Sequence, residues 1–260
     1  MKDLVFTIDV EEWYHAENLR PYLDTETLKN KHTTIDYTYK VLDFLDECDS
    51  KGTFFFLGCI AKVYPELVRE VVNRGHEIAS HGLNHDLLWG MNEKQTNLDI
   101  EISTKIIEDV SGIKIIGYRS PCFSQNEFIA DALEQNGFKY SSMSIESTFH
   151  DRYEANKFNI TNKIQDFPMP VTEIGKFRIV STGGGWFRFF SVGIQNWLLN
   201  HCNKDPLIFY CHPWDFGKNF WGDSKVPLIK KLRHTVGTKT ALNKLRHFKF
   251  GPKPLKSFLD

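Results

Sequence analysis

Two histidines and two carboxylates in this chain have the residue types and spacing of metal ligands. His81 and His85 are four residues apart just after a short apolar run, and Asp9 and Glu11 follow another such run. On a helical turn, imidazoles at i and i+4 lie about 5 to 6 Å apart at Cβ and can hold one metal ion together. A solvated turn with two polar side chains is the alternative for the histidine pair taken alone. The choice depends on which other residues reach the same place.

Arg119 and His212 also stand near the ends of apolar runs. Two imidazoles and one carboxylate leave open positions around a metal, which is typical of a catalytic site, since a structural zinc site is closed by four protein ligands. The second carboxylate could serve as a general base, the other histidine could protonate a leaving amine, and the arginine could keep the base ionised. The metal would polarise a carbonyl oxygen and activate water. Together these groups predict the hydrolysis of an amide.

The backbone around the two carboxylates is predicted to be extended. Side chains alternate along an extended chain, so Asp9 and Glu11 point to one side and Glu12 points to the other. Glu12 is therefore expected to be an ordinary solvated acid. Asp9 and Glu11 are expected at the C-terminal end of a buried strand, where α/β proteins place their chemistry.

Alternating apolar and amphipathic segments predict an α/β fold that brings these residues together. Buried strands are predicted at residues 4–8, 52–58, 77–80, 113–118 and 207–211. Helices are predicted at residues 34–49, from Pro65 to Gly75, from Asn92 to Gly112 and at residues 127–135. The expected buried stripe of the third helix is Leu98, Ile102, Ile106 and Val110. Parallel strands joined by helices place the C-terminal strand ends on one working face, and with them the candidate residues.

The segment 144–190 lacks this rhythm, and we expect a strand-rich insertion there. Gly183, Gly184 and Gly185 stand in a row within it. They could let the backbone approach a ligand or could make a sharp bend, and we prefer the bend. No Lys followed by Ser or Thr comes after them, so a phosphate-binding loop is not predicted.

Length and composition fit one large α/β domain or two small ones. The chain has 260 residues, 41% of them hydrophobic, and 32 Lys and Arg balance 33 Asp and Glu. The whole-chain charge therefore indicates neither nucleic acid nor a membrane surface as a partner. Within residues 225–256, ten Lys or Arg occur without an acid. We expect a closing helix with a solvated basic face there, and contact with an anionic substrate carrier is the alternative.

The sequence also predicts the compartment. No run reaches the roughly 18 apolar residues of a membrane span, so no integral membrane segment is predicted. The start, Met1-Lys2-Asp3, and the short apolar run after it lack the length and cleavage site of a signal peptide. Five cysteines without a Cys-x-x-Cys spacing are expected to be reduced thiols. These features predict a cytoplasmic protein.

Short motifs surround the candidate residues. They are Thr7-Ile8-Asp9-Val10-Glu11, Ser80 with His81 and His85, Arg119-Ser120-Pro121-Cys122-Phe123, and Tyr210-Cys211-His212. These resemble the first, second, third and fifth motifs of the NodB-type polysaccharide deacetylases, carbohydrate esterase family 4, and the resemblance covers most of residues 4–215. The spellings Asp-Val-Glu-Glu-Trp, Gly-Gly-Gly-Trp-Phe-Arg and His-Pro-Trp-Asp are most similar to the subgroup associated with exopolysaccharide biosynthesis.

The resemblance implies a distorted (β/α) barrel with fewer than eight strands. It implies one catalytic domain over residues 1–260, with a core at about 4–215 and a basic helical closing segment at about 224–260. The implied roles are Asp9 as general base, Arg119 as the residue that tethers this base, His212 as general acid, Glu11, His81 and His85 as metal ligands, and Pro121, Phe123, Trp186, Arg188 and Trp214 as substrate-binding residues. The implied cofactor is one divalent metal ion, zinc in the first place, with cobalt, nickel or manganese as alternatives.

The chain departs from the family pattern at two places. One residue separates the base from the candidate metal carboxylate, which is Glu11 where the family has an aspartate directly after the base, and Glu12 stays the alternative ligand. The fourth motif, which in the family supplies an aspartate that holds the arginine, has none in residues 140–142. Asp215 or Glu146 could compensate. Without either of them, the arginine would be held less firmly.

These residues and the resemblance predict a metal-dependent N-deacetylase that acts on an N-acetylated sugar. The sugar could belong to a polysaccharide precursor, an oligosaccharide, or a nucleotide-linked or lipid-linked amino sugar. A deformylase of a lipid-linked amino sugar is the nearest alternative. A non-catalytic sugar-binding relative and a metal-stabilised scaffold are alternatives from other classes. The sequence predicts neither the sugar nor the oligomeric state.

Overall fold

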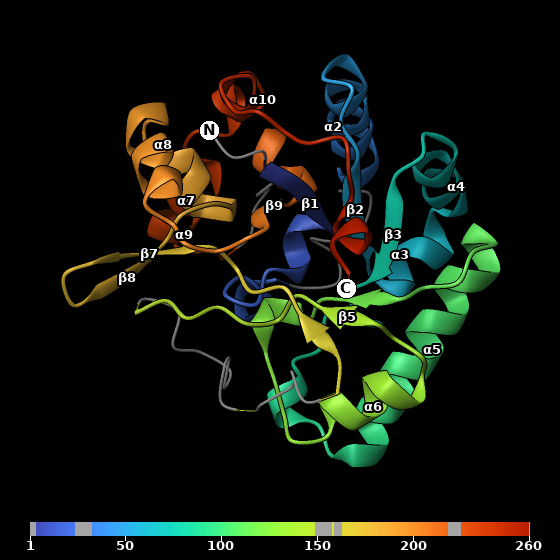
Figure 1. The fold of residues 1–260 in the computed structure, drawn as a ribbon. Coiled ribbons are helices and arrows are strands. Elements are labelled where there is room, and N and C mark those ends of the chain that lie inside the picture. Colours follow the sequence, from blue (N-terminus) through green and yellow to red (C-terminus); the bar gives the residue numbers. More distant parts are fainter. Residues whose placement is uncertain (1–3, 24–32, 149–157, 159–162, 218–224, 260) are drawn as a thin grey trace.

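One curled sheet of seven parallel strands forms the centre of the molecule, with helices packed around its outer side (Figure 1). The computed structural model describes residues 4–23, 33–148, 158, 163–217 and 225–259. The strands, in spatial order, are β6 (Gln165–Asp166), β5 (Tyr140–Ser141), β4 (Gly117–Tyr118), β3 (Glu77–Ser80), β2 (Gly52–Phe56), β1 (Leu4–Val10) and β9 (Leu207–Cys211). The sheet has two ends, so the prediction of a distorted barrel with fewer than eight strands is confirmed.

β1 is a central strand, and its sequence suits that position. All seven of its residues are buried, as expected for an apolar, β-branched run in a parallel strand that is covered on both faces. It pairs with β2 along one edge and with β9 along the other. Its C-terminal end therefore lies beside the ends of both neighbours. This is the place where the candidate residues of the first and fifth motifs follow.

The helices lie close to the predicted positions. Their bounds are α2 Thr34–Glu47, α3 Gly58–Val63, α4 Pro65–Asn73, α5 Glu93–Ser111, α6 Ile129–Gln135, α7 Gly184–Phe189, α8 Val192–Asn200, α9 Leu228–Thr235 and α10 Thr238–Leu245. Short 3-10 turns occur at Trp13–His15, Arg20–Tyr22, Leu88–Gly90, Pro121–Phe123, Pro213–Phe216 and Leu255–Phe258. Both predicted ends of α5 are confirmed. The Asn92 side chain accepts a hydrogen bond from the Gln95 backbone N–H, and Gly112 ends the helix with a φ of 71°.

The predicted buried stripe of α5 is wrong in its first half. Leu98 and Ile102 are 43% and 42% exposed. The helix instead turns a face with small polar residues inward. At Gly58 of α3, an added Cβ would lie 3.1 Å from Ser103 Cα, so the two helices approach closely because both residues are small. A stripe of large apolar residues at that contact would keep the helices apart.

The predicted strand at 113–118 is shorter in the structure. Only β4, Gly117–Tyr118, pairs within the sheet. The backbone N–H of Ile115 donates to the side chain of Glu108 at 2.9 Å, so a side chain of α5 takes the hydrogen bond that a strand neighbour would take. Apolar content alone therefore overestimated the length of this strand.

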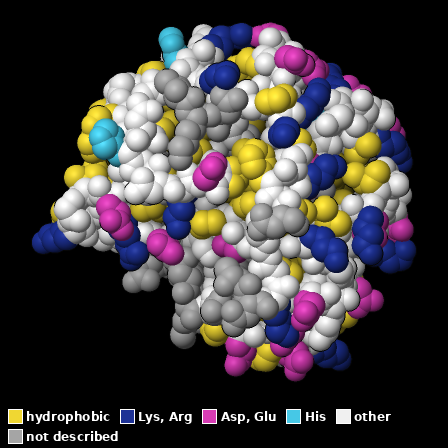
Figure 2. Space-filling model, viewed as in Figure 1, with side chains coloured by type: hydrophobic (Ala, Val, Ile, Leu, Met, Phe, Trp, Pro, Cys, Tyr) yellow, Lys and Arg dark blue, Asp and Glu magenta, His cyan; other side chains and the backbone are white. Residues whose placement is uncertain are grey.

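The strand-rich insertion is confirmed in its described part, while residues 149–157 and 159–162 lie outside the described residues. β7 (Val171–Ile174) and β8 (Phe177–Val180) form an antiparallel hairpin that projects from the body of the molecule (Figures 1 and 2). The glycines after it make a bend, with a φ of 84° at Gly183. An added Cβ at Gly183 would lie 2.1 Å from the ring of Tyr210, so the bend also packs tightly on β9.

The surface has a mixed character. On the face shown in Figure 2, hydrophobic side chains lie in several small groups among charged and polar ones.

All five cysteines carry free thiols, as expected. Among the described helices, none has both the length and the apolar character needed to cross a membrane.

The C-terminal segment closes the N-terminal end of the sheet. Beyond α10, the chain runs alongside β1, where Leu4 donates to the carbonyl of Lys249 and accepts from the N–H of Gly251, both at 2.9 Å. Further on, the N–H of Lys256 donates to the buried carboxylate of Glu77 at the start of β3, at 3.0 Å. The predicted closing helix is thus two helices followed by an extended segment.

Glu12 requires a correction, because it is fully buried and not solvated. Its carboxylate accepts hydrogen bonds from the backbone N–H groups of Thr33, at 3.0 Å, and Thr34, at 3.2 Å, at the start of α2. The extended backbone does aim Glu12 away from the side of Glu11. The first turn of α2 lies there, and its unpaired N–H groups and partial positive charge favour a carboxylate.

Replacing Glu12 by Ala should lower the free energy of unfolding by about 2 kcal/mol, because buried N–H groups of α2 would lose their acceptor. Asp36, an exposed acid in the same first turn, provides the control. Asp36→Ala should cost less than about 1 kcal/mol, since it removes only a charge near the helix end. Urea unfolding followed by circular dichroism measures both values. Equal losses in the two variants would contradict the capping role.

Candidate active site

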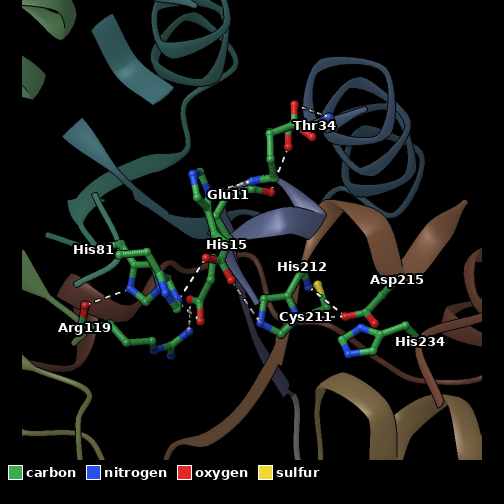
Figure 3. A network of polar contacts seen from close by, with 12 residues as sticks. Glu11, His15, Thr34, His81, Arg119, Cys211, His212, Asp215 and His234 are labelled. Atoms are coloured by element: carbon green, nitrogen blue, oxygen red, sulfur yellow. Dashed lines mark hydrogen bonds and ion pairs between the residues drawn. The ribbon is translucent and has the colours of Figure 1, made fainter. Parts of the chain in front are cut away.

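A cavity of about 250 Å³ lies at the C-terminal ends of β1, β3 and β9. Its wall includes nine of the eleven predicted site residues: Asp9, Glu11, His81, His85, Phe123, Trp186, Arg188, His212 and Trp214. The other two are Arg119, which lies fully buried behind Asp9, and Pro121, which lies beside the turn at Gly82. Figure 3 shows Glu11, His81, Arg119 and His212 converging from separate strand ends.

The histidine pair does not lie on a helical turn, so that part of the prediction is wrong. Residues 81–85 form a loop after β3, with a φ of 83° at Gly82 and 62° at His85. Two residues from other segments hold this loop. The carboxylate of Asp99, in α5, accepts from the N–H of Leu83 at 3.3 Å, and Arg20 donates to the carbonyl of His85 at 2.7 Å. These contacts bring the two imidazole rings to a centroid distance of 5.4 Å.

His81 has a defined tautomer. Its Nδ1 lies 2.8 Å from the backbone carbonyl oxygen of Arg119, which can only accept, so Nδ1 carries the proton. The lone pair of Nε2 is then available on the cavity side. Burial lowers the pKa of His81 below its ordinary value, which keeps the ring neutral. A neutral imidazole oriented through its other nitrogen is the form in which histidine binds metals.

Glu11 completes a set of three buried groups that could hold a metal ion. Its carboxylate oxygen and one nitrogen each of His81 and His85 lie within 4.8 Å of one another. Burial raises the pKa of Glu11, but the neighbouring imidazoles, His85 first, outweigh burial and bring it to about 2, so the carboxylate is ionised. Oε2 lies 2.9 Å from Nε2 of His85, yet it has no aligned hydrogen-bond partner among the described residues. Converging donor atoms that lack aligned hydrogen bonds fit a divalent ion.

The alternative ligand, Glu12, does not fit this set. Both of its carboxylate oxygens accept hydrogen bonds at the start of α2. Glu11 and Asp9, by contrast, both face the cavity, where the backbone N–H of Glu11 turns back to the carbonyl of Asp9 at 3.1 Å. The geometry therefore favours Glu11 as the third ligand and leaves Asp9 for another role.

Asp9 is held by a buried arginine. Nη1 of Arg119 donates to Oδ1 of Asp9 at 2.7 Å and to the hydroxyl of Thr7 at 3.0 Å. Nη2 donates to the hydroxyl of Ser142 at 3.1 Å, and this hydroxyl in turn donates to the carbonyl of Phe167 at 2.8 Å. The other oxygen of Asp9 lies 3.9 Å from Nε2 of His81, on the side of the ligands.

Ser142 therefore stands where the fourth motif was expected to supply an aspartate. Neither predicted substitute contacts Arg119. Asp215 bonds to His212 and Arg188, and Glu146 pairs with Arg178 near the surface at 3.6 Å. The guanidinium is thus anchored by a hydroxyl and not by a second carboxylate.

His212 is oriented by a buried chain of charges. Oδ2 of Asp215 lies 3.0 Å from its Nδ1 and accepts from its backbone N–H at 2.9 Å, and Nε of Arg188 donates to Oδ1 of Asp215 at 2.7 Å. Burial alone would lower the pKa of His212, but the hydrogen bond and charge of Asp215 raise it above the ordinary value. Nε2 is left toward the cavity, 3.7 Å from Oε1 of Glu11. The ring of Trp214 stacks on the imidazole of His212 with a distance of 4.3 Å between the ring centroids.

Apolar side chains line one part of the remaining cavity wall. Cys122 and Phe123 have φ values of 52° and 57°, an unfavourable conformation for two successive residues with side chains, and both line the cavity. Trp186 faces them from α7 and stacks on Phe190 at a centroid distance of 5.3 Å. Aromatic surfaces of this kind suit the apolar face of a sugar ring.

Sequence reasoning missed three partners in this site. Thr7 and Ser142 hold Arg119, and Asp215 holds His212 rather than the arginine. The spacing of His212 and Asp215 carried a usable signal, because a residue three positions after a helix start often reaches back to the first backbone N–H. The role of Ser142 had no local signal, since its partner, Arg119, comes 23 residues earlier in the sequence.

Comparisons with known proteins point to one group. A family model described as Polysaccharide deacetylase matches residues 31–141, and a model described as a domain of unknown function, DUF3473, matches residues 141–252. A peptidoglycan deacetylase of Helicobacter pylori is 24% identical over 141 residues, which cover 52% of this chain and 48% of that protein. The chain therefore spans about half the length of this relative.

Solved structures resemble the fold over nearly the whole chain. A CE4-family pseudoenzyme of Bacillus anthracis has a TM-score of 0.55 and 15% identity, and the match covers 100% of this chain and 66% of that one. A family 4 acetyl xylan esterase of Clostridium thermocellum, solved with a cobalt ion, has a TM-score of 0.51 and 16% identity, covering 98% and 89%. At such low identity these matches concern the fold alone.

The ligand set can be tested by metal content. Glu11→Gln should lose most of the bound divalent metal, because an amide oxygen is a much weaker ligand than a carboxylate. Glu12→Gln should keep it, since Glu12 lies at the start of α2. Mass spectrometry of metals in both purified variants gives the ratio of ion to protein. Loss of metal in Glu12→Gln with retention in Glu11→Gln would reverse the assignment.

Proposed function

We propose that the chain is a metal-dependent hydrolase that removes an N-acetyl group from an N-acetylated sugar. This follows from its membership of the NodB-type polysaccharide deacetylase family, carbohydrate esterase family 4. The observation that carries the proposal is the convergence of three groups in one cavity. These are the ligand set of Glu11 and two histidines, the arginine-held Asp9, and His212. The peptidoglycan deacetylase relative supports the substrate class.

The cofactor in this proposal is one divalent ion held by Glu11, His81 and His85. Bound there, it would supply Lewis-acid polarisation of the scissile amide carbonyl. Two imidazole nitrogens and one carboxylate oxygen suit zinc first, and cobalt, nickel or manganese next. The cobalt ion in the acetyl xylan esterase of similar fold supports a divalent metal in this fold.

Asp9 acts as the general base in this proposal. Hydrolysis requires the loss of a proton from water as its oxygen bonds to the carbonyl carbon. Asp9 lies within the cavity wall, and Arg119 keeps its carboxylate in one orientation through a contact of 2.7 Å. A carboxylate accepts a proton in its ionised form, and the contact with Arg119 is what holds this one in place.

His212 acts as the general acid. The amide nitrogen must gain a proton as the C–N bond breaks, and acetate and a free amine then leave. Asp215 holds Nδ1, so Nε2 is the nitrogen that can give its proton to a group in the cavity. The raised pKa of His212 keeps the imidazole protonated at pH values where an ordinary histidine has lost its charge.

A non-catalytic sugar-binding role is the second candidate. The replacement of the fourth-motif aspartate by Ser142 favours it, and a pseudoenzyme is among the proteins of similar fold. The retained Asp9, Arg119 and His212 oppose it, because a binding protein needs neither a base nor an acid. Release of acetate and of formate, measured over N-acetylated and N-formylated hexosamines, oligosaccharides and nucleotide sugars, separates these possibilities. Metal-loaded protein that releases neither product would favour binding alone.

Asp9→Asn should lower kcat about 10²- to 10⁴-fold, because the amide cannot accept the proton from water. Its metal content should stay near that of the parent, since Asp9 is not in the ligand set. Acetate release and metal analysis on the same sample provide both values. A variant that keeps its metal and its full kcat would exclude Asp9 as the base.

Arg188 has a positioning role in this proposal, and not the direct substrate contact implied by the resemblance. Its guanidinium contacts Asp215 and also donates to the carbonyl of Val236 at 2.6 Å, so little of it is left for a ligand. Arg188→Met should lower kcat about 10- to 100-fold with little change in KM, because Asp215 would hold His212 less firmly. Arg188→Lys should restore part of the loss, since it returns the charge.

Arg178→Met is the matched control for Arg188→Met. Arg178 forms an ion pair with Glu146 near the surface, where both side chains are about half exposed. Its kcat should stay at the parent value, because surface pairs contribute little and the site does not depend on this one. Circular dichroism confirms that each variant is folded. An equal loss in the two Met variants, or a change confined to KM, would contradict the positioning role.

A further inference from the structure

α9 presents its apolar side chains to solvent. Leu228 and Ile229 are 72% and 74% exposed, and Leu232 and Val236 are 48% and 40% exposed. No residue of α9 is buried. At 3.6 residues per turn these four side chains fall on one side of the helix, which we call the outer face of α9. In a globular protein such a stripe normally faces the core.

The opposite side of α9 is polar and packs on the protein. Nζ of Lys230 donates to the carbonyl of Asn18 at 3.1 Å and lies 5.2 Å from the centre of the Tyr22 ring. Nε2 of His234 lies 3.1 Å from the side-chain oxygen of Asn18. Arg188 donates to the carbonyl of Val236 at the end of the helix. Polar contacts therefore fix α9 in an orientation in which no described residue buries its outer face.

The apolar surface continues beyond α9. Phe189, at the end of α7, is 59% exposed. It follows Arg188, whose carbonyl oxygen would lie 2.8 Å from a Cβ added at Gly237, so the end of α7 packs directly after Val236. The exposed Phe189 thus lies one residue after a backbone contact with the end of the α9 segment.

Exposed cations lie before, within and after α9. Lys225 and Lys239, both exposed, precede and follow α9, and Arg233 within the helix is also exposed. Residues 225–256 contain ten Lys or Arg and no Asp or Glu, although the whole chain is nearly neutral. The positive charge is therefore concentrated in the segment that carries the outer face of α9.

We propose that the outer face of α9, together with Phe189, docks on the surface of an anionic lipid bilayer. A helix with an apolar side and flanking cations lies in the interface with its apolar side chains among the acyl chains and its cations near anionic headgroups. A second copy of this chain is a poorer occupant. A symmetric dimer places the same surface of both copies together, which would bring the cations of the two copies against each other.

Docking would also orient the cavity. Arg233 and His234, from the end of α9, line the cavity wall, so the opening would lie near the headgroups. A lipid-linked N-acetylated sugar would present its sugar at that level, and this consequence for the substrate rests on the proposed function. The docking itself does not depend on catalysis.

The test uses the full chain with its metal and large vesicles of phosphatidylcholine, with or without phosphatidylglycerol. Sedimentation measures the bound fraction. The parent should bind only vesicles that contain phosphatidylglycerol, and added salt should weaken binding. The triple variant Leu228→Ser, Ile229→Ser, Leu232→Ser should bind at least about tenfold more weakly, since its apolar anchor is lost. Lys225→Glu with Lys239→Glu should give a similar loss by reversing charge.

Leu98→Ser with Ile102→Ser, combined with Lys94→Glu, is the control on α5, where the two apolar side chains are exposed to about the same extent as Leu232. It should bind vesicles like the parent. Absence of parent binding to anionic vesicles, or equal losses in the α9 and α5 variants, would overturn the proposal. Two other results would also overturn the proposal. One is a parent protein that runs as a dimer in gel filtration while the triple variant runs as a monomer. The other is a parent protein that binds a soluble acidic protein without vesicles and does not bind the vesicles. Acetate release from a soluble substrate should be unchanged in the triple variant, so a failure of the proposed activity is seen separately from a failure of docking.

Discussion

The buried ion pair between Arg119 and Asp9 is the interaction on which the rest of the site depends. Arg119 is fully buried, and a charged guanidinium in such a place is costly unless its donors are used. Asp9 and two hydroxyls accept from its two Nη atoms, while the backbone carbonyl of Arg119 fixes the tautomer of His81. One residue directly after the short strand β4 therefore sets the orientation of the proposed base and of one proposed metal ligand. The removal of either charge would leave the other uncompensated in the interior.

Local sequence patterns predicted most of the fold and the residues at the strand ends. Apolar runs predicted β1, β2, β3 and β9, and the capping residues Asn92 and Gly112 predicted the ends of α5. These features are determined by residues that are neighbours in the sequence. The errors concern contacts between distant segments. Glu12 is buried because α2 begins beside it, Leu98 is exposed because α5 packs through small residues, and the loop after β3 turns around Asp99. None of these contacts is visible in a window of sequence.

The chemistry is divided between the two matched segments of the chain. The deacetylase model covers His81, His85 and Arg119, and the second model covers His212 with the chain of contacts from Asp215 through Arg188 to the end of α9. Glu11 and Asp9 precede both. The segment 141–252 thus contributes directly to the site. It supplies the proposed acid, and its contacts link the position of α9 to the orientation of that acid.

The central place of β1 has a consequence for how the chain acquires its structure. Leu4 pairs with Leu207, so one edge of β1 is covered only by a strand about 200 residues later in the sequence. Contacts of such sequence separation form slowly, and an apolar strand edge that stays open meanwhile is prone to pair with other chains. The same pairing brings His212 beside Asp9 and Glu11. The pairing of β1 with β9 therefore completes the sheet and assembles the site together.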